Sequence, residues 1–346
     1  MEILYSPHHA KHATTLRLPG YPLPYFEIPA RAEAIVQAIR KAGLGKLDEP
    51  RDFGMAPITD VHAPDFIRYL QTAYQSSRPF FEGTKPAIAD TFNGRGWRHK
   101  PTGWPGQLGY YSFDVAAAIL EGTWEAAYWS AQCAVTAADR VRSGSRFAYA
   151  LCRPPGHHAA RDQHGGFCYL NNAAIAATAL RRSTGQRVAI LDIDYHHGNG
   201  TQEIFYADPD VLFCSLHASP DAEYPFFWGG KEERGEGEAI GCNRNWPLPH
   251  SVSENDYLTA LGEAVAVIRE FKPGFLVLSA GFDFMESDPV PLNGGSFRVG
   301  PSGLDSVARI IAGLSLPTVI IQEGGYDVER LGLYVARLLT GLIRHT

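Results

Sequence analysis

The sequence has no excess of positive charge and no long hydrophobic run. Of its 346 residues, 31 are basic and 37 acidic, which gives a net charge of −6, whereas a general nucleic-acid binder carries a basic stripe. No apolar run approaches the roughly 18 residues that cross a membrane. The first residues also lack the basic and then apolar pattern of a signal peptide. We therefore expect neither a nucleic-acid partner nor a membrane partner.

Cysteine is also scarce. The five cysteines are scattered and show no CxxC spacing, which fits free, mostly buried thiols in a reducing cytoplasm. Cys152 and Cys168 each lie near a histidine in the sequence, so a cysteine nucleophile stays open as an alternative. Small buried cysteines are, however, far commoner than catalytic ones.

The chain has no internal repeat, no low-complexity tract and no clear linker. Its composition, 45% hydrophobic and 20% charged residues, is that of a globular protein that can bury a sizeable core. We therefore expect a single domain over residues 1–346.

Short apolar runs with β-branched or aromatic residues recur along the chain and end in glycine, proline and polar residues. Such runs are typical of strands that are covered on both faces, as in parallel sheets. Four of these runs lie at residues 146–158, 187–200, 274–289 and 316–327, and a similar run lies at 210–217.

Helical patterns separate these runs. They cover residues 122–144, 171–185 and 253–274, and the last of them opens on a Ser-x-x-Asp cap. Strands that alternate with helices predict an α/β fold with a parallel sheet. Because ligands bind outside the carboxyl ends of such strands, the polar residues that end the apolar runs are candidate site residues.

Residues 76–111 differ from the rest of the chain. They are rich in glycine, proline and aromatic residues and show no periodicity. A loop this long inside a compact domain is uncommon, and is usually functional or disordered. Its aromatic content favours an ordered, functional insertion loop.

The densest polar cluster is LDIDYHHGNG, residues 191–200. In an extended strand alternate side chains share a face, so Asp192, Asp194 and His196 should point the same way. An Asp-x-His pair offers zinc an oxygen and a nitrogen, and Asp283 is our candidate for a third ligand that leaves a fourth position open. The alternative is that Asp192 and Asp194 are buried hydrogen-bonding residues that bracket a turn.

Two further motifs supply groups for proton transfer and charge stabilisation. His157 and His158 follow a rigid Pro-Pro-Gly turn, and a neutral imidazole there can accept a proton from water and return it to a leaving amine. Tyr326 follows a Gly-Gly pair, and its phenol is suited to donate to a developing oxyanion. The alternative for Tyr326 is an ordinary tyrosine after a turn.

Five motifs together resemble the histone deacetylase superfamily in order and approximate spacing, over roughly residues 110–340. They are RPPGHHA, GFCYLNNAAIAA, LDIDYHHGNGTQEIFY, SAGFD and EGGY. The resemblance implies an arginase-like α/β fold, with an eight-stranded parallel sheet flanked by helices on both faces. It also implies an enzyme, a metal-dependent deacetylase that hydrolyses N-acetylated amines.

The resemblance further assigns roles to individual residues. It makes Asp194, His196 and Asp283 the ligands of one catalytic zinc ion. The catalytic residues that it implies are His158 as general base and acid, His157 as its electrostatic neighbour, Asp192 and Asn199 as their supports, and Tyr326 as the residue that polarises the acetyl carbonyl. Asn199 is a departure from those family members that have aspartate there, and an amide supports the imidazole less strongly than a carboxylate does.

The resemblance also implies residues around the substrate and structural potassium ions. The substrate-binding residues would be Phe167, Tyr224, Gly166 and Gly324. A first potassium site would use Asp192, Asp194, His196, Ser215 and Leu216, and a second would use Phe205, Asp208 and Val211.

Arginase-like enzymes of the same fold hold two manganese ions, and these need two further carboxylates. The corresponding positions here are Gly198 and Met285. We therefore expect a site for one metal ion, which would be zinc, although iron(II) or cobalt would accept the same nitrogen and oxygen ligands.

Within the superfamily, the chain resembles the bacterial acetylpolyamine amidohydrolases in residues 20–35, 107–111 and 122–127. In that family the long loop helps to form a homodimer, whose partner narrows the tunnel and favours slender acetylated amines. We therefore expect a small cationic substrate, an acetylated polyamine or a short diamine such as acetylputrescine or acetylcadaverine, which is cleaved to acetate and free amine.

The carboxylates that would meet the free ammonium group of such a substrate do not stand at the family's positions, which are Pro105 and Ala116 here. Asp114, Glu121 and Asp90 lie near enough in the sequence to replace them. Two other functions stay open. One is a lysine deacetylase that acts on proteins or peptides, and the other is a non-catalytic binding protein on the same fold.

Overall fold

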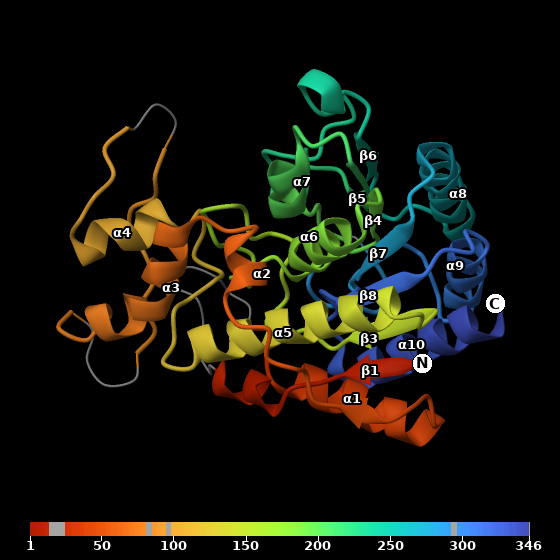
Figure 1. The fold of residues 1–346 in the computed structure, drawn as a ribbon, viewed down its shortest axis with the longest axis horizontal. Coiled ribbons are helices and arrows are strands. Elements are labelled where there is room, and N and C mark those ends of the chain that lie inside the picture. The colour runs from red at the N-terminus through yellow and green to blue at the C-terminus, as the bar shows by residue number, and fades with distance from the viewer. Residues whose placement is uncertain (14–24, 81–84, 95–97, 292–295, 346) are drawn as a thin grey trace.

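The computed structural model describes residues 1–13, 25–80, 85–94, 98–291 and 296–345. Eight parallel strands form one sheet in the order β2-β1-β3-β8-β7-β4-β5-β6 (Figure 1). The strands are β1 (Glu2–Leu4), β2 (Leu47–Asp48), β3 (Phe147–Ala150), β4 (Val188–Asp192), β5 (Val211–Ala218), β6 (Asn243–Leu248), β7 (Phe275–Ala280) and β8 (Thr318–Gln322). Four of the five apolar runs contain one of these strands, and the run 210–217 covers β5 except for its last residue. The predicted α/β fold with an eight-stranded parallel sheet is confirmed.

Helices connect the strands and cover the sheet. They are η1 (Pro7–Lys11), α1 (Ala30–Ala42), α2 (Ala56–Thr59), α3 (Pro64–Ser77), α4 (Trp104–Tyr110), α5 (Thr123–Arg142), α6 (Asn172–Thr184), α7 (Asn199–Phe205), η2 (Gly237–Ala239), α8 (Glu254–Phe271), α9 (Gly303–Ala312) and α10 (Val328–Arg344). The three helices predicted from the sequence are α5, α6 and α8. At the start of α8 the Ser253 hydroxyl accepts a hydrogen bond from the Asp256 backbone N–H, as the cap motif predicts.

Alternate residues of each inner strand enter two different hydrophobic cores. In β4, Ala189 and Leu191 pack in the core that α1, α8, α9 and α10 cover, whereas Val188 and Ile190 pack in the core that α3, α5 and α6 cover. Because both faces of the sheet are covered, successive strand residues are all apolar. This burial explains the continuous apolar runs of the sequence.

The stretch 76–111 is less irregular than the sequence suggests. The expectation of a continuous loop is wrong at residues 104–110, which form helix α4, and α3 extends to Ser77. Trp104 Nε1 donates to the Ala73 carbonyl at 3.0 Å, and the Trp104 ring stacks on Phe80. Contacts with α3 therefore order this segment, and α3 and α4 lie together at the left of Figure 1. Residues 81–84 and 95–97 of this stretch, and 20–24 of the stretch 20–35, lie outside the described residues.

Within the described ranges, every helix is too short or too polar to cross a membrane.

The burial of β4 gives a direct test of the core. Ile190→Ala should lower the free energy of unfolding by about 2–5 kcal/mol, because it removes fully buried methylene groups and leaves a cavity. Ile240→Ala is the matched control, since Ile240 is 70% exposed, and it should change that free energy by less than about 0.5 kcal/mol. Chemical denaturation measures both values, and equal losses would contradict this difference in burial.

Candidate active site

Polar residues that follow β3, β4, β7 and β8 meet at the carboxyl edge of the sheet. Strand β4 ends at Asp192, so the expectation that an extended strand continues to His196 is wrong. Beyond it the backbone turns: the Asp194 N–H donates to Asp192 Oδ1 at 3.1 Å, and the His196 N–H donates to Asp194 Oδ1 at 2.9 Å. The carboxylates thus do bracket turns, as the alternative interpretation has it. That interpretation does not account for the other side chains that lie beside these carboxylates.

Asp194, His196 and Asp283 form a buried cluster, in which one possible ligand atom from each residue lies within 4.8 Å of the others. His196 Nδ1 lies 3.0 Å from Asp283 Oδ2 and 3.4 Å from Asp194 Oδ1. Burial and the adjacent Asp194 carboxylate raise the pKa of Asp283 to about 6. Two buried carboxylates beside an imidazole are a donor set that suits a divalent cation.

Backbone groups hold both carboxylates of this cluster. The Tyr195 N–H donates to Asp283 Oδ1 at 2.9 Å, and the Gly324 N–H donates to Asp194 Oδ2 at 2.8 Å. A Cβ atom on Gly324 would lie only 2.4 Å from Asp283 Oδ2 and 2.6 Å from Asp194 Oδ2. Gly324, expected beside the substrate, therefore lies directly against the carboxylates, where no larger residue fits.

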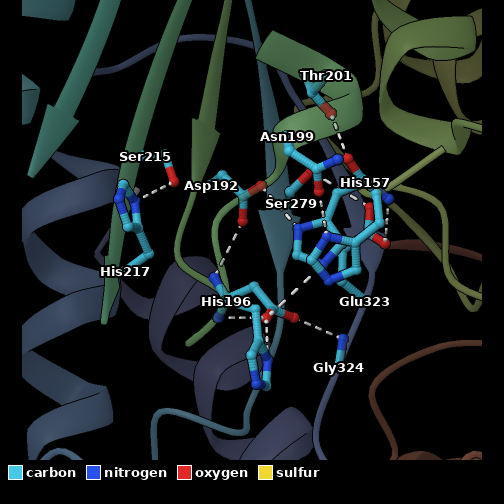
Figure 2. A network of polar contacts seen from close by, with 12 residues as sticks. His157, Asp192, His196, Asn199, Thr201, Ser215, His217, Ser279, Glu323 and Gly324 are labelled. Atoms are coloured by element: carbon cyan, nitrogen blue, oxygen red, sulfur yellow. Dashed lines mark hydrogen bonds and ion pairs between the residues drawn. The ribbon is translucent and has the colours of Figure 1, made fainter. Parts of the chain in front are cut away.

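The two tandem histidines have different partners. His157 Nδ1 lies 3.0 Å from Asp192 Oδ2 (Figure 2). His158 Nδ1 lies 2.8 Å from Asn199 Oδ1. Burial opposes a charge on His157, but the carboxylates of Asp194 and Asp192 outweigh it and raise the pKa of His157 to about 10. Burial, together with the neighbouring His157 and His196, holds the pKa of His158 well below its ordinary value.

These shifts separate the two imidazoles by protonation state. His157 is the cationic member of the pair and His158 the neutral one. Because an amide oxygen can only accept, His158 Nδ1 carries the hydrogen of that bond, which leaves Nε2 as the basic nitrogen.

A cavity of about 330 Å³ opens above the cluster. His158, His196 and Tyr326 line it, and the pKa of Tyr326 is raised well above its ordinary value by burial, so its hydroxyl keeps its proton. The expected substrate-binding residues Phe167, Tyr224, Gly166 and Asp114 line the same cavity. Asp90 and Glu121, the other two candidate carboxylates, are exposed and do not line it.

Sequence reasoning missed three charged residues at this site. The Glu323 carboxylate accepts hydrogen bonds from the Gly156 N–H at 2.7 Å and the His157 N–H at 3.2 Å, and burial raises its pKa to about 7. Glu323 stands in the EGGY motif, so a signal for it existed. Glu223 is also buried and lines the cavity, next to Tyr224 in the sequence.

The third missed residue is Arg31, which comes from α1. Its guanidinium donates to the carbonyls of Glu323 and Gly325, each at 2.6 Å, and lies 4.5 Å from the centre of the Tyr326 ring. It is fully buried and pairs with Glu27. Through its two hydrogen bonds to backbone carbonyls, Arg31 fixes the turn that carries Tyr326. No sequence motif connects Arg31 to this turn, which lies almost 300 positions away in the chain.

The residues expected at the potassium sites form two separate groups. In the first, Asp192 and Ser215 are register partners on β4 and β5, and Leu216 follows on β5. Ser215 Oγ lies 2.8 Å from His217 Nδ1 (Figure 2). The second group lies in the turn from α7 to β5.

In that turn the Asp208 N–H donates to the Phe205 carbonyl at 3.0 Å, and the Val211 N–H donates to the Asp208 carbonyl at 3.4 Å. The Asp208 carboxylate also pairs with Arg181 at 2.7 Å. The chain thus brings both sets of residues together.

Two alternatives lose support from the geometry. A Cβ atom on Gly198 would lie 2.3 Å from Asp192 Oδ2, and Met285 is buried in the core, so neither position can provide a carboxylate for a second metal ion. Cys152 and Cys168 are fully buried, and burial raises the pKa of each thiol well above its ordinary value. Neither thiol is therefore suited to act as a nucleophile.

The chain is similar to known proteins over almost its whole length. The family model described as "Histone deacetylase domain" matches residues 25–342. Acetylpolyamine amidohydrolase 1 of Pseudomonas aeruginosa is 44% identical over 343 residues, which are 98% of this chain and 97% of that protein. Acetylpolyamine amidohydrolase of Mycoplana ramosa is 38% identical over 345 residues, 99% of each chain.

A crystal structure of acetylpolyamine aminohydrolase from Burkholderia pseudomallei has the same fold, with a TM-score of 0.93 at 41% identity, over 100% of this chain and 99% of that one. The resemblance that the five motifs indicated is thereby confirmed. The chain belongs to the histone deacetylase family and is similar to its bacterial acetylpolyamine amidohydrolases.

Proposed function

We propose that this protein is a zinc-dependent amidohydrolase that removes the acetyl group from acetylated polyamines or short acetylated diamines and releases acetate and the free amine. The observation that carries the proposal is the buried cluster of Asp194, His196 and Asp283, whose His196 lines the same cavity as His158 and Tyr326. A binding protein on the same fold would not need all of these groups at one site.

The donor set fits a single zinc ion. Asp194, His196 and Asp283 would hold it with two oxygen ligands and one nitrogen ligand, which are ligand types that zinc accepts and which leave a fourth position open, and iron(II) or cobalt would accept the same atoms. Gly198 and Met285 offer no carboxylate for a second ion. The chemistry that zinc supplies when bound is polarisation of the amide carbonyl and a lower pKa for the attacking water.

The chain's own residues would move the protons. Neutral His158 would take a proton from water at Nε2 and later give it to the leaving amine, while Asn199 holds its Nδ1–H. His157, kept cationic by Asp192 and Asp194, would stabilise the negative charge that develops nearby. The Tyr326 hydroxyl would donate to the oxyanion formed from the acetyl carbonyl.

The choice of substrate is supported by the relatives and by the cavity. The relatives named above are acetylpolyamine amidohydrolases. The cavity is aromatic, and its lining includes Phe167, Tyr224, Phe113, Phe227 and Trp228. Such walls suit the methylene chain of a slender amine better than a bulky group.

The proposal has three further parts. The structural potassium ions would bind at the two groups described above, and a second copy of the chain would complete the tunnel in a homodimer. The cytoplasm would be the compartment, an expectation supported by five cysteines that are all free.

A panel of substrates tests the proposal directly. The metal-stripped protein should be inactive, and reloading with zinc should restore hydrolysis of acetylputrescine and acetylcadaverine. An acetyl-lysine peptide should be cleaved more slowly, because a protein tail fits a narrow tunnel poorly. A clear preference for the peptide would instead make the protein a lysine deacetylase, and turnover without metal would contradict the metal-dependent chemistry.

Tyr326→Phe tests the oxyanion donor. The variant should keep its metal but lose about 10²–10³-fold in kcat, the cost of removing one oxyanion-hole donor. Metal analysis and steady-state kinetics on acetylputrescine measure both quantities. Near-full turnover by the variant would show that another group stabilises the oxyanion.

Substitution of Gly324, which lies close to two of the proposed metal ligands, tests their role. Zinc-loaded protein should contain about one zinc ion per chain at this site, and Gly324→Ala should weaken zinc binding by about 10–100-fold, because the added methyl group displaces Asp194 and Asp283. Gly262→Ala is the control, since a Cβ atom there meets no neighbour. Competition with a chelator measures the affinities, and two ions per chain would contradict the mononuclear site.

A further inference from the structure

The Asp114 carboxylate has three hydrogen-bond donors from the protein itself. Its Oδ2 accepts from the Tyr224 hydroxyl at 2.6 Å and from the Gly166 N–H at 2.8 Å, and its Oδ1 accepts from the Ala116 N–H at 2.9 Å. A carboxylate offers about four acceptor positions, so most of its capacity is used within the protein. This arrangement differs from that of a carboxylate that awaits a ligand.

The segment around Asp114 is itself tied down. The Ser112 hydroxyl donates to the Asp114 carbonyl at 2.8 Å, and the Phe113 N–H donates to the His164 carbonyl at 3.1 Å. Asp114 is therefore held in place independently of the groups that donate to its carboxylate.

Both partners of Asp114 Oδ2 belong to walls of the cavity. The Tyr224 ring stands edge-on to the His158 ring, with centroids 5.0 Å apart, and 6.0 Å from that of His196. Gly166 precedes Phe167, whose ring lies 5.8 Å from Tyr326. One oxygen atom thus connects the wall beside the proposed base to the wall beside the proposed oxyanion donor.

The Gly166–Phe167 turn needs such an anchor. Gly166 has φ +54° and Phe167 has φ +66°, and the second value is unfavourable for a residue with a side chain. A Cβ atom on Gly166 would lie 2.4 Å from the His158 ring and 2.7 Å from the Tyr224 hydroxyl, so the turn packs directly against both. A small shift of this turn would therefore move Phe167 relative to the reacting groups.

We propose that Asp114 is a positioning residue that fixes the separation of the Tyr224 wall and the Gly166–Phe167 wall, and that it does not bind the ammonium group of the substrate. This inference rests on the proposed function and replaces the role that the sequence suggested for Asp114. A hydrogen bond from a hydroxyl to a carboxylate is about twice as strong as a bond between neutral groups, which suits this anchoring role.

Two substrates of equal length separate positioning from charge recognition. Acetylputrescine carries the ammonium group, and N-pentylacetamide carries a methyl group in its place. Asp114→Ala should lower kcat/KM for both by the same factor, about 10–100-fold, because misplaced walls affect either amide alike. Asp114→Asn should lose less with both, since its amide oxygen can still accept from Tyr224 and Gly166.

The opposite pattern would overturn the inference. If Asp114 binds the ammonium group, Asp114→Asn should impair acetylputrescine as severely as Asp114→Ala does and leave N-pentylacetamide unaffected. The matched control is Asp52→Ala. Asp52 also accepts hydrogen bonds from a tyrosine hydroxyl and a glycine N–H, which belong to Tyr128 and Gly54. Asp52 does not line the cavity. This variant should leave both kinetic values unchanged.

A double-variant cycle tests the bond without turnover. Tyr224→Phe removes the hydroxyl alone, so the variant with both Asp114→Ala and Tyr224→Phe should lose less in its thermal-unfolding midpoint than the sum of the two single losses. Additive losses would contradict the positioning role. If the zinc-loaded wild type cleaves neither amide, the proposed function fails, and this cycle still decides the role of Asp114.

Discussion

Two carboxylates, Asp194 and Asp283, are buried side by side where β4 and β7 end. Their mutual repulsion is a cost that the surrounding structure must offset. His196 lies against both, the backbone N–H groups of Tyr195 and Gly324 donate to them, and the register of β4 and β7 pairs Asp192 with Ser279 just before them. The close approach of β8 explains why residue 324 is a glycine. The need to stabilise two neighbouring carboxylates thus determines which groups surround them at this edge of the sheet.

The N-terminal part of the chain also stabilises this edge of the sheet. Arg31 on α1 reaches the carbonyls of Glu323 and Gly325, and Glu27 balances its charge inside the protein. Glu323 in turn accepts from the backbone N–H groups of Gly156 and His157. The turn with Tyr326 and the turn with the tandem histidines are therefore held by one continuous polar network.

The walls of the cavity depend on a second region of the N-terminal part. Asp114 accepts from groups on two segments that are far apart in the sequence, Gly166 and Tyr224. Aromatic walls alone would leave their separation variable, because ring pairs are favourable over centroid distances of about 4.5–7 Å, whereas hydrogen-bond lengths vary by only about 0.5 Å. Two hydrogen bonds to one carboxylate oxygen fix the separation of the two walls.

The sequence by itself located five of the eight strands that the structure describes, the helices α5, α6 and α8, and the motif residues that meet at the sheet edge, because apolar runs and local turn residues are properties of contiguous segments. It also identified the family, which the comparisons confirm. The tertiary structure alone decided the helix at 104–110, the end of β4 at Asp192, and the places of Arg31 and Glu223. It also showed which groups face the Asp114 oxygens. These features depend on contacts between residues distant in the chain, and no local pattern records such contacts.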